Sequence, residues 1–232
     1  MIIPITREQV ITADNLATVR RFFEYRRKGD GYEYNDTKFQ EKATKKYDVV
    51  LSSKGNIFAG VLFEICLYRK IVQEVLKCIR NEDSYEKAID KPVYASNELI
   101  SKAFSHEITI GKYDEGYDFL LMNYQGGLKI DAKVYGTAIV TDEQSCSRLH
   151  LYVDETQYNR NVADIYIQGF ILENKTELYF YVAGWKYSHD LIHFPKIKNP
   201  AYGVKVPQLN NINKLIEMIY QNDFDSSKYS PF

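Results

Sequence analysis

The spacing of the hydrophobic residues in this chain changes from helical to strand-like near Phe104. In residues 14–28 and 57–79 they recur every three or four positions, which is typical of helices. In residues 104–185 they form short runs, rich in β-branched and aromatic residues and bounded by turn-forming residues, which predicts strands. A further helical pattern follows over residues 208–220. This order predicts a mixed α/β or α+β fold.

The 232 residues are enough for one domain with a small accessory part. We expect a helical N-terminal extension over residues 1–50, a main domain over residues 51–222 and a C-terminal tail over residues 223–232. No apolar run approaches the roughly 20 residues of a membrane span, and the N-terminus lacks the pattern of a secretion signal. We therefore expect a cytoplasmic protein that does not associate with membranes.

The net charge of −1 argues against a protein that coats nucleic acid by bulk electrostatics. It is compatible with an enzyme whose acids bind a metal ion while its basic residues face DNA, because the two charges nearly cancel. Basic residues of two N-terminal groups are candidates for DNA contact: Arg20, Arg21, Arg26, Arg27, Lys42, Lys45 and Lys46. The alternative is a solvated helix surface, since cations near a helix C-terminus are favourable in any case.

The helix expected over residues 57–79, with Asn56 as its N-cap, carries an acid within its apolar stripe. At 100° per residue, Glu64 lies in the middle of that stripe. The segment around it, AGVLFEICL, is apolar almost all round and is expected to be buried. A buried carboxylate is costly unless a partner neutralises it. Glu64 is therefore either a ligand of a cation or a structural acid paired with an arginine or a tyrosine hydroxyl.

Two neighbouring predicted strands carry acids that can face each other. Asp131 and Lys133 share one strand face, roughly 6.5 Å apart. A turn centred on Tyr124–Gln125 would place Asp118 opposite Asp131, with their Cβ atoms about 5 Å apart. A competing turn at residues 126–127 would separate the two acids by roughly 13 Å. Opposed carboxylates repel each other, and a bound divalent cation would compensate them; a salt-bridged, solvent-facing strand is the alternative.

Asp118 and the triplet Asp131-Ala132-Lys133 resemble the PD-(D/E)xK motif of the restriction-endonuclease-like nuclease superfamily. Tyr117 stands where that motif usually has a proline. The resemblance implies an α-β-β-β-α-β core with the motif on its second and third strands. The implied fold is thus a central mixed β-sheet flanked by helices.

The resemblance also implies the chemistry of a metal-dependent deoxyribonuclease. Asp118 and Asp131 would hold Mg²⁺, for which Mn²⁺ can substitute, together with the main-chain carbonyl of Ala132. Glu64 on the first core helix would bind the ion directly or through water. Lys133 would position or deprotonate the attacking water and stabilise the developing negative charge.

The resemblance covers residues 57–185 and points first to an endonuclease of restriction-like type, for which a homodimer is one expected assembly. Structure-specific or exonucleolytic DNA processing in repair, recombination or viral replication is an alternative. A non-catalytic nucleic-acid-binding protein that keeps the fold is another. Two polar residues are candidates for an accessory role at the site: Gln168 and Glu107.

Overall fold

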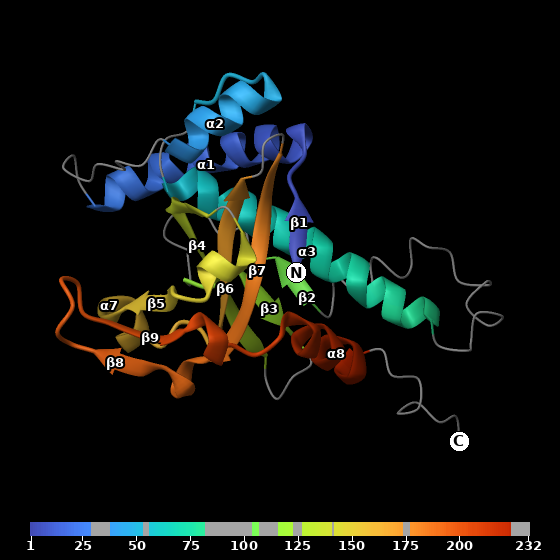
Figure 1. Ribbon diagram of the computed structural model, residues 1–232, viewed down its shortest axis with the longest axis vertical. Helices are drawn as coiled ribbons and strands as arrows, with labels where there is room; N and C mark the ends of the chain where they lie inside the picture. Colours follow the sequence, from blue (N-terminus) through green and yellow to red (C-terminus); the bar gives the residue numbers. More distant parts are fainter. Residues whose placement is uncertain are drawn as a thin grey trace.

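The computed structural model has a mixed α/β fold, in which a six-stranded mixed sheet is flanked by helices and a three-stranded sheet lies beside it (Figure 1). No helix in the described part of the chain is long and apolar enough to cross a membrane. The structure describes residues 1–28, 38–52, 56–81, 104–106, 116–122, 127–140, 142–173 and 177–223.

The large sheet has the strand order β1-β7-β6-β4-β3-β2. Strands β4 and β6 run parallel, and the other neighbouring pairs are antiparallel. The mixed sheet with flanking helices confirms the expected fold class at this level, and the restriction-endonuclease-like core stays a prediction. The strands span these residues: β1 Ile2–Pro4, β2 Phe104–His106, β3 Phe119–Leu121, β4 Leu128–Val140, β6 Ile165–Glu173 and β7 Leu178–Tyr187.

Helices cover one face of the large sheet. Helix α3 (Asn56–Asn81) contacts β4, and both α1 (Arg7–Lys28) and α8 (Ile212–Asp223) contact α3. Helix α2 (Lys38–Tyr47) lies against α1 and α3. The buried side chains of these helices and of the sheet face beneath them form one hydrophobic cluster. Burial of this shared apolar surface is what holds the helical layer on the sheet.

Helix α3 is the central element of that layer, and its predicted burial is confirmed. Its first half is buried all round, including Phe58, Leu62 and Phe63. Gly169 of β6 permits the close approach, because a Cβ atom there would lie 2.3 Å from the Phe63 ring. The helix is thereby fixed against the middle of the sheet, one residue before Glu64.

The N-terminal segment is part of the same packed structure. Thr6 and Gln9 form the reciprocal cap of α1: the Thr6 main-chain N–H donates to Gln9 Oε1 (2.9 Å), and the Gln9 N–H donates to Thr6 Oγ1 (3.3 Å). Strand β1, which the sequence analysis did not predict, pairs Ile3 with Phe180 of β7. The boundary expected after residue 50 stays a prediction, while described residues on both sides of it share one hydrophobic cluster.

The small sheet packs on the other face of the large one. It consists of β5 (His150–Asp154), β9 (Ala201–Lys205) and β8 (Ile192–Phe194), in the order β5-β9-β8. Leu151 of β5 packs in one buried cluster with Tyr166 of β6. Of these three strands, the sequence analysis predicted only β5.

Three further helices were not predicted as they occur. The short helices α6 (Glu143–Cys146) and α7 (Glu155–Asn159) lie on either side of β5 in the sequence. Helix α8 begins at Ile212, later than the expected residue 208. Residues Val206–Gln208 form a separate 3₁₀ helix, and an isolated bridge, in which the Trp185 and Asn210 main chains exchange hydrogen bonds of 3.0 and 2.8 Å, lies between it and α8.

Candidate functional site

The pairing of β3 with β4 places the two motif acids side by side. Phe119 pairs with Ile130, so continuing the register by one residue sets Asp118 beside Asp131. The Asp118 N–H donates to the Ile130 carbonyl at 2.9 Å. This is the register expected from a turn centred on residues 124–125, and it excludes the competing register. The turn itself lies outside the described residues.

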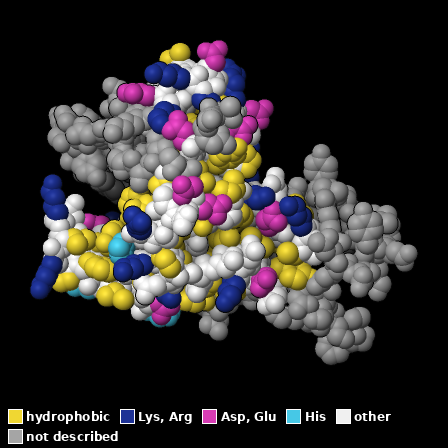
Figure 2. Space-filling view, viewed as in Figure 1, with side chains coloured by type: hydrophobic (Ala, Val, Ile, Leu, Met, Phe, Trp, Pro, Cys, Tyr) yellow, Lys and Arg dark blue, Asp and Glu magenta, His cyan; other side chains and the backbone are white. Residues whose placement is uncertain are grey.

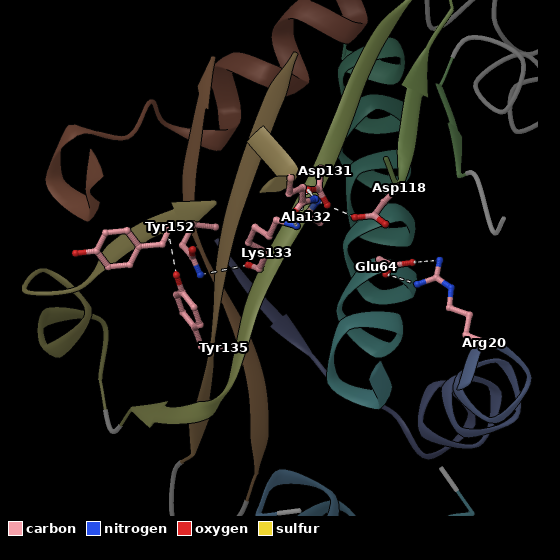
Figure 3. A network of polar contacts seen from close by, with 10 residues as sticks. Arg20, Glu64, Asp118, Asp131, Ala132, Lys133, Tyr135 and Tyr152 are labelled. Atoms are coloured by element: carbon pink, nitrogen blue, oxygen red, sulfur yellow. Dashed lines mark hydrogen bonds and ion pairs between the residues drawn. The ribbon is translucent and has the colours of Figure 1, made fainter. Parts of the chain in front are cut away.

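Asp118 is the carboxylate with the least favourable surroundings. Its Oδ2 accepts a hydrogen bond from the Ala132 N–H at 2.8 Å. Burial raises its pKa well above the usual value, and the Glu64 and Asp131 carboxylates raise it further. The Ala132 N–H and the Lys133 ammonium lower the pKa, but they do not outweigh these effects. Asp118 therefore lies in a region of uncompensated negative charge, between β4 and α3 (Figure 3).

Asp131 is buried and held by two side chains. Lys133 Nζ lies 2.6 Å from Asp131 Oδ2, as expected for two residues on one strand face. Gln157 of α7 donates from Nε2 to the same oxygen at 2.7 Å, and its Oε1 accepts from Lys133 Nζ at 3.0 Å. The three groups form a closed triangle that fixes the ammonium beside the carboxylate. The sequence analysis missed Gln157, because nothing in its polar connecting segment distinguishes it.

Glu64 is buried, as predicted, and it is paired with an arginine. Arg20 of α1 donates to both Glu64 oxygens, at 2.8 and 2.9 Å, and His106 Nε2 lies 3.4 Å from Oε2. Burial raises the pKa of Glu64, but the contacts with His106 and Arg20 outweigh it and the pKa is lowered. This arrangement agrees with the alternative of a structural acid paired with an arginine (Figure 3), and the role of Glu64 as a cation ligand stays a prediction.

These contacts place one candidate for DNA contact and add one residue. The Arg20 side chain points towards Glu64 because α1 packs on α3, and its contact with DNA stays a prediction. His106 was missed, although strand alternation places it on the same face as Phe104. Its ring is packed against Tyr68 and Phe119, with centroid distances of 5.5 and 5.2 Å.

The accessory candidates have different outcomes. Gln168 is fully buried on β6, in register with Lys133, and its Nε2 donates to the Lys133 carbonyl at 3.2 Å. Its Oε1 has no hydrogen-bond partner within the described part of the chain. Gln168 thus supports the main chain of β4 below the site, and an accessory role in catalysis stays a prediction. Glu107 lies outside the described residues.

The remaining DNA-contact candidates lie on α1 and α2. Lys42 forms an ion pair with Glu173 at the end of β6, so its charge is already compensated. Lys45 is exposed, and Lys46 lies over the Tyr47 ring at 5.9 Å from its centroid. Three arginines belong to α1 but their side chains lie outside the described part of the structure: Arg21, Arg26 and Arg27.

The residues at the site fit a hard cation in part. Asp118 and Asp131 offer carboxylate oxygens, which Mg²⁺ prefers. A strand residue directs its N–H and C=O to the same side, so the Ala132 carbonyl lies on the side of Asp118, to which its N–H donates. Within the described residues, no three acidic, histidine or cysteine side chains form a metal-binding group. Glu64 is near enough for its charge to raise the pKa of Asp118, but its oxygens are paired with Arg20 and lie beside His106.

Comparisons of the chain with family models, curated proteins and solved structures found no match. The residues of the site, above all the juxtaposed aspartates and the lysine paired with one of them, are therefore what indicates a function.

Proposed function

We propose that this protein is a Mg²⁺-dependent nuclease of the PD-(D/E)xK type that hydrolyses phosphodiester bonds in DNA. The observation that carries the proposal is the register that sets Asp118 beside Asp131, with Lys133 2.6 Å from the latter. The element order supports it, since α3 is followed by the antiparallel β2, β3 and β4 and then by β6 parallel to β4. This order agrees with the core that the motif implies.

The chemistry follows from the residues of the site. Asp118 and Asp131 bind Mg²⁺ together with the Ala132 carbonyl, and the ion, when bound, neutralises charge on the scissile phosphate and acidifies a water molecule. Lys133 holds its ammonium at the same place, where it orients the attacking water and stabilises negative charge in the transition state. Gln157 keeps the ammonium in position through its two hydrogen bonds.

Among the possible tasks, we favour an endonuclease of restriction-like type, and a homodimer is the assembly that a palindromic target would require. Structure-specific or exonucleolytic processing uses the same site chemistry, and it differs in the products. A protein that binds nucleic acid without cutting it is the rival from another class. It does not account for the three charged groups brought together at one point of the sheet.

The test is incubation of supercoiled plasmid with purified protein in Mg²⁺ or EDTA. We expect cleavage in Mg²⁺ only, and a loss of at least about 100-fold in Asp131→Ala and Lys133→Ala with DNA binding retained. Glu74→Ala is the matched control, because Glu74 pairs with Lys70 and Lys77 on the surface of α3. Discrete bands identify an endonuclease, and end-dependent loss identifies an exonuclease. Wild-type activity in Asp131→Ala, or DNA binding without cleavage in the wild type, would contradict the proposal.

A further inference from the structure

The charges around the site are fixed by two ion pairs on opposite sides of Asp118. On one side Arg20 binds both oxygens of Glu64, and on the other Lys133 binds Asp131. Glu64 and Asp131 are each only 4% exposed, so these pairs are shielded from solvent. Asp118 lies between them and accepts a main-chain hydrogen bond from Ala132 (Figure 3).

We propose that the site takes one divalent cation, at Asp118 and Asp131, and that Arg20 held by Glu64 supplies the second positive charge that a two-metal nuclease obtains from a second ion. This inference rests on the proposed function. It assigns Glu64 the task of holding a guanidinium, in place of the ligand role that the motif implies, and it makes Arg20 a positioning residue of the site.

The balance of charge favours one ion. Arg20 pairs with Glu64 and Lys133 pairs with Asp131, so of the three carboxylates the charge of Asp118 is left over, with a main-chain hydrogen bond from Ala132. One Mg²⁺ changes the balance to a single positive charge, which the scissile phosphate neutralises. A second Mg²⁺ would leave two positive charges in a largely buried site, where uncompensated charge is costly.

The geometry of the arginine pair also opposes a second ion. A guanidinium that donates to both oxygens of a carboxylate makes one of the strongest ion pairs in proteins. A cation bound by Glu64 would have to displace Arg20. The Arg20 side chain is only 18% exposed, and its positive charge would then lack the Glu64 carboxylate as a partner. In the metal-free protein, Arg20 thus occupies both oxygens of Glu64, whereas Lys133 and Gln157 contact Oδ2 of Asp131 and Ala132 donates to Oδ2 of Asp118.

The first experiment titrates the purified full chain with Mn²⁺ and follows free Mn²⁺ by electron paramagnetic resonance. We expect one bound ion per chain, lost in Asp131→Asn. In Glu64→Gln we expect one bound ion, with an affinity within about tenfold of the wild type. Loss of a residue that supports a metal ligand typically lowers metal affinity by about 10- to 100-fold, and we expect the smaller effect here. Two ions in the wild type, or no ion in Glu64→Gln, would overturn the inference.

The second experiment removes the guanidinium. We expect Arg20→Met to bind a second, weaker Mn²⁺ at the released Glu64, Arg20→Lys to remain at one ion, and Arg20→Met/Glu64→Gln to return to one. Lys70→Met, which removes one of the two lysine partners of Glu74 on α3, is the control and should bind one ion. A folded Arg20→Met that binds one ion would overturn the inference; if this variant does not fold, the titrations of the wild type and Glu64→Gln decide.

The two proposals fail separately. A wild-type chain that cuts DNA and binds two ions contradicts only the role of Arg20. A wild-type chain that binds no Mn²⁺ and cuts no DNA contradicts the nuclease function itself.

Discussion

At the scale of single residues, the negative charge of Asp118 destabilises the metal-free protein. Its pKa is raised well above the usual value by burial and by the carboxylates of Glu64 and Asp131. Because the pKa in the folded state exceeds the pKa in the unfolded state, the folded chain binds this proton more tightly. The stability of the metal-free protein should therefore fall as pH rises from about 4, the unfolded value, through the higher folded value.

The corresponding prediction concerns Asp118→Asn. The amide removes the repelled charge and keeps an oxygen that can accept from the Ala132 N–H. We expect the metal-free variant to be more stable than the wild type at neutral pH by about 1 kcal/mol, which corresponds to roughly 2–4 °C in Tm. Thermal unfolding in EDTA measures this difference. Addition of Mg²⁺ should stabilise the wild type but not the variant, and an unchanged or lower Tm in EDTA would contradict the account.

At the scale of elements, the position of α3 on β6 sets the position of Glu64. Gly169 has no side chain, and a Cβ atom there would lie 2.3 Å from the Phe63 ring, far inside van der Waals contact. The ring or the helix would have to move, and overpacking of this kind costs about 1–3 kcal/mol. The site is sensitive to this contact because Glu64 follows Phe63 directly.

We therefore expect Gly169→Ala to lower the free energy of unfolding by about 1–3 kcal/mol and to lower nuclease activity. Chemical denaturation and the plasmid assay measure the two effects. Gly60→Ala is the matched control on α3, because a Cβ there meets only Glu64 Oε1 at 3.9 Å and alanine favours the helix. A Gly169→Ala chain as stable as the wild type would show that the helix is not held as described.

What the sequence predicted at this scale depends on local periodicity. The 26 residues of α3 carry a continuous apolar stripe, and its bounds and burial were predicted closely. The β3–β4 register followed from turn chemistry and strand alternation, which are also local. Strands β8 and β9 span only 3 and 5 residues, and β9 pairs with β5 about fifty positions earlier. Such pairings depend on tertiary contacts that periodicity does not reveal.

The residues of the site also divide into those that local sequence predicts and those that depend on tertiary contacts. Asp118, Asp131 and Lys133 were predicted because two adjacent strands carry them. The partner of Glu64 could not be chosen from the sequence, since Arg20 lies 44 positions away and reaches Glu64 only because α1 packs on α3. Gln157 is on a helix of five residues without a periodic signal.

At the scale of the whole molecule, the net charge of −1 leaves no bulk attraction for DNA. Figure 2 shows Lys and Arg side chains interspersed with Asp and Glu over the visible face. Binding of DNA should therefore depend on a few cations, and α2 ends with two of them, Lys45 and Lys46. Each lysine that contacts a phosphate contributes about one unit to the salt dependence of binding.

We predict that Lys45→Glu/Lys46→Glu weakens DNA binding for all sequences and reduces the slope of log affinity against log salt by about two. Fluorescence anisotropy over a range of salt concentrations measures the slope. Lys77→Glu is the control, because Lys77 is exposed on α3 and already pairs with Glu74. An equal loss of slope in both variants would mean that α2 is not the surface that meets DNA.

The most direct measurement of the central claim is the anomalous diffraction of crystals grown with Mn²⁺. The account predicts one strong peak, at coordination distance, about 2.0–2.3 Å, from the Asp118 and Asp131 oxygens and the Ala132 carbonyl, with Arg20 still on Glu64. Crystals that bind Mn²⁺ elsewhere, or that show no ion between the two aspartates at saturating Mn²⁺, would contradict it.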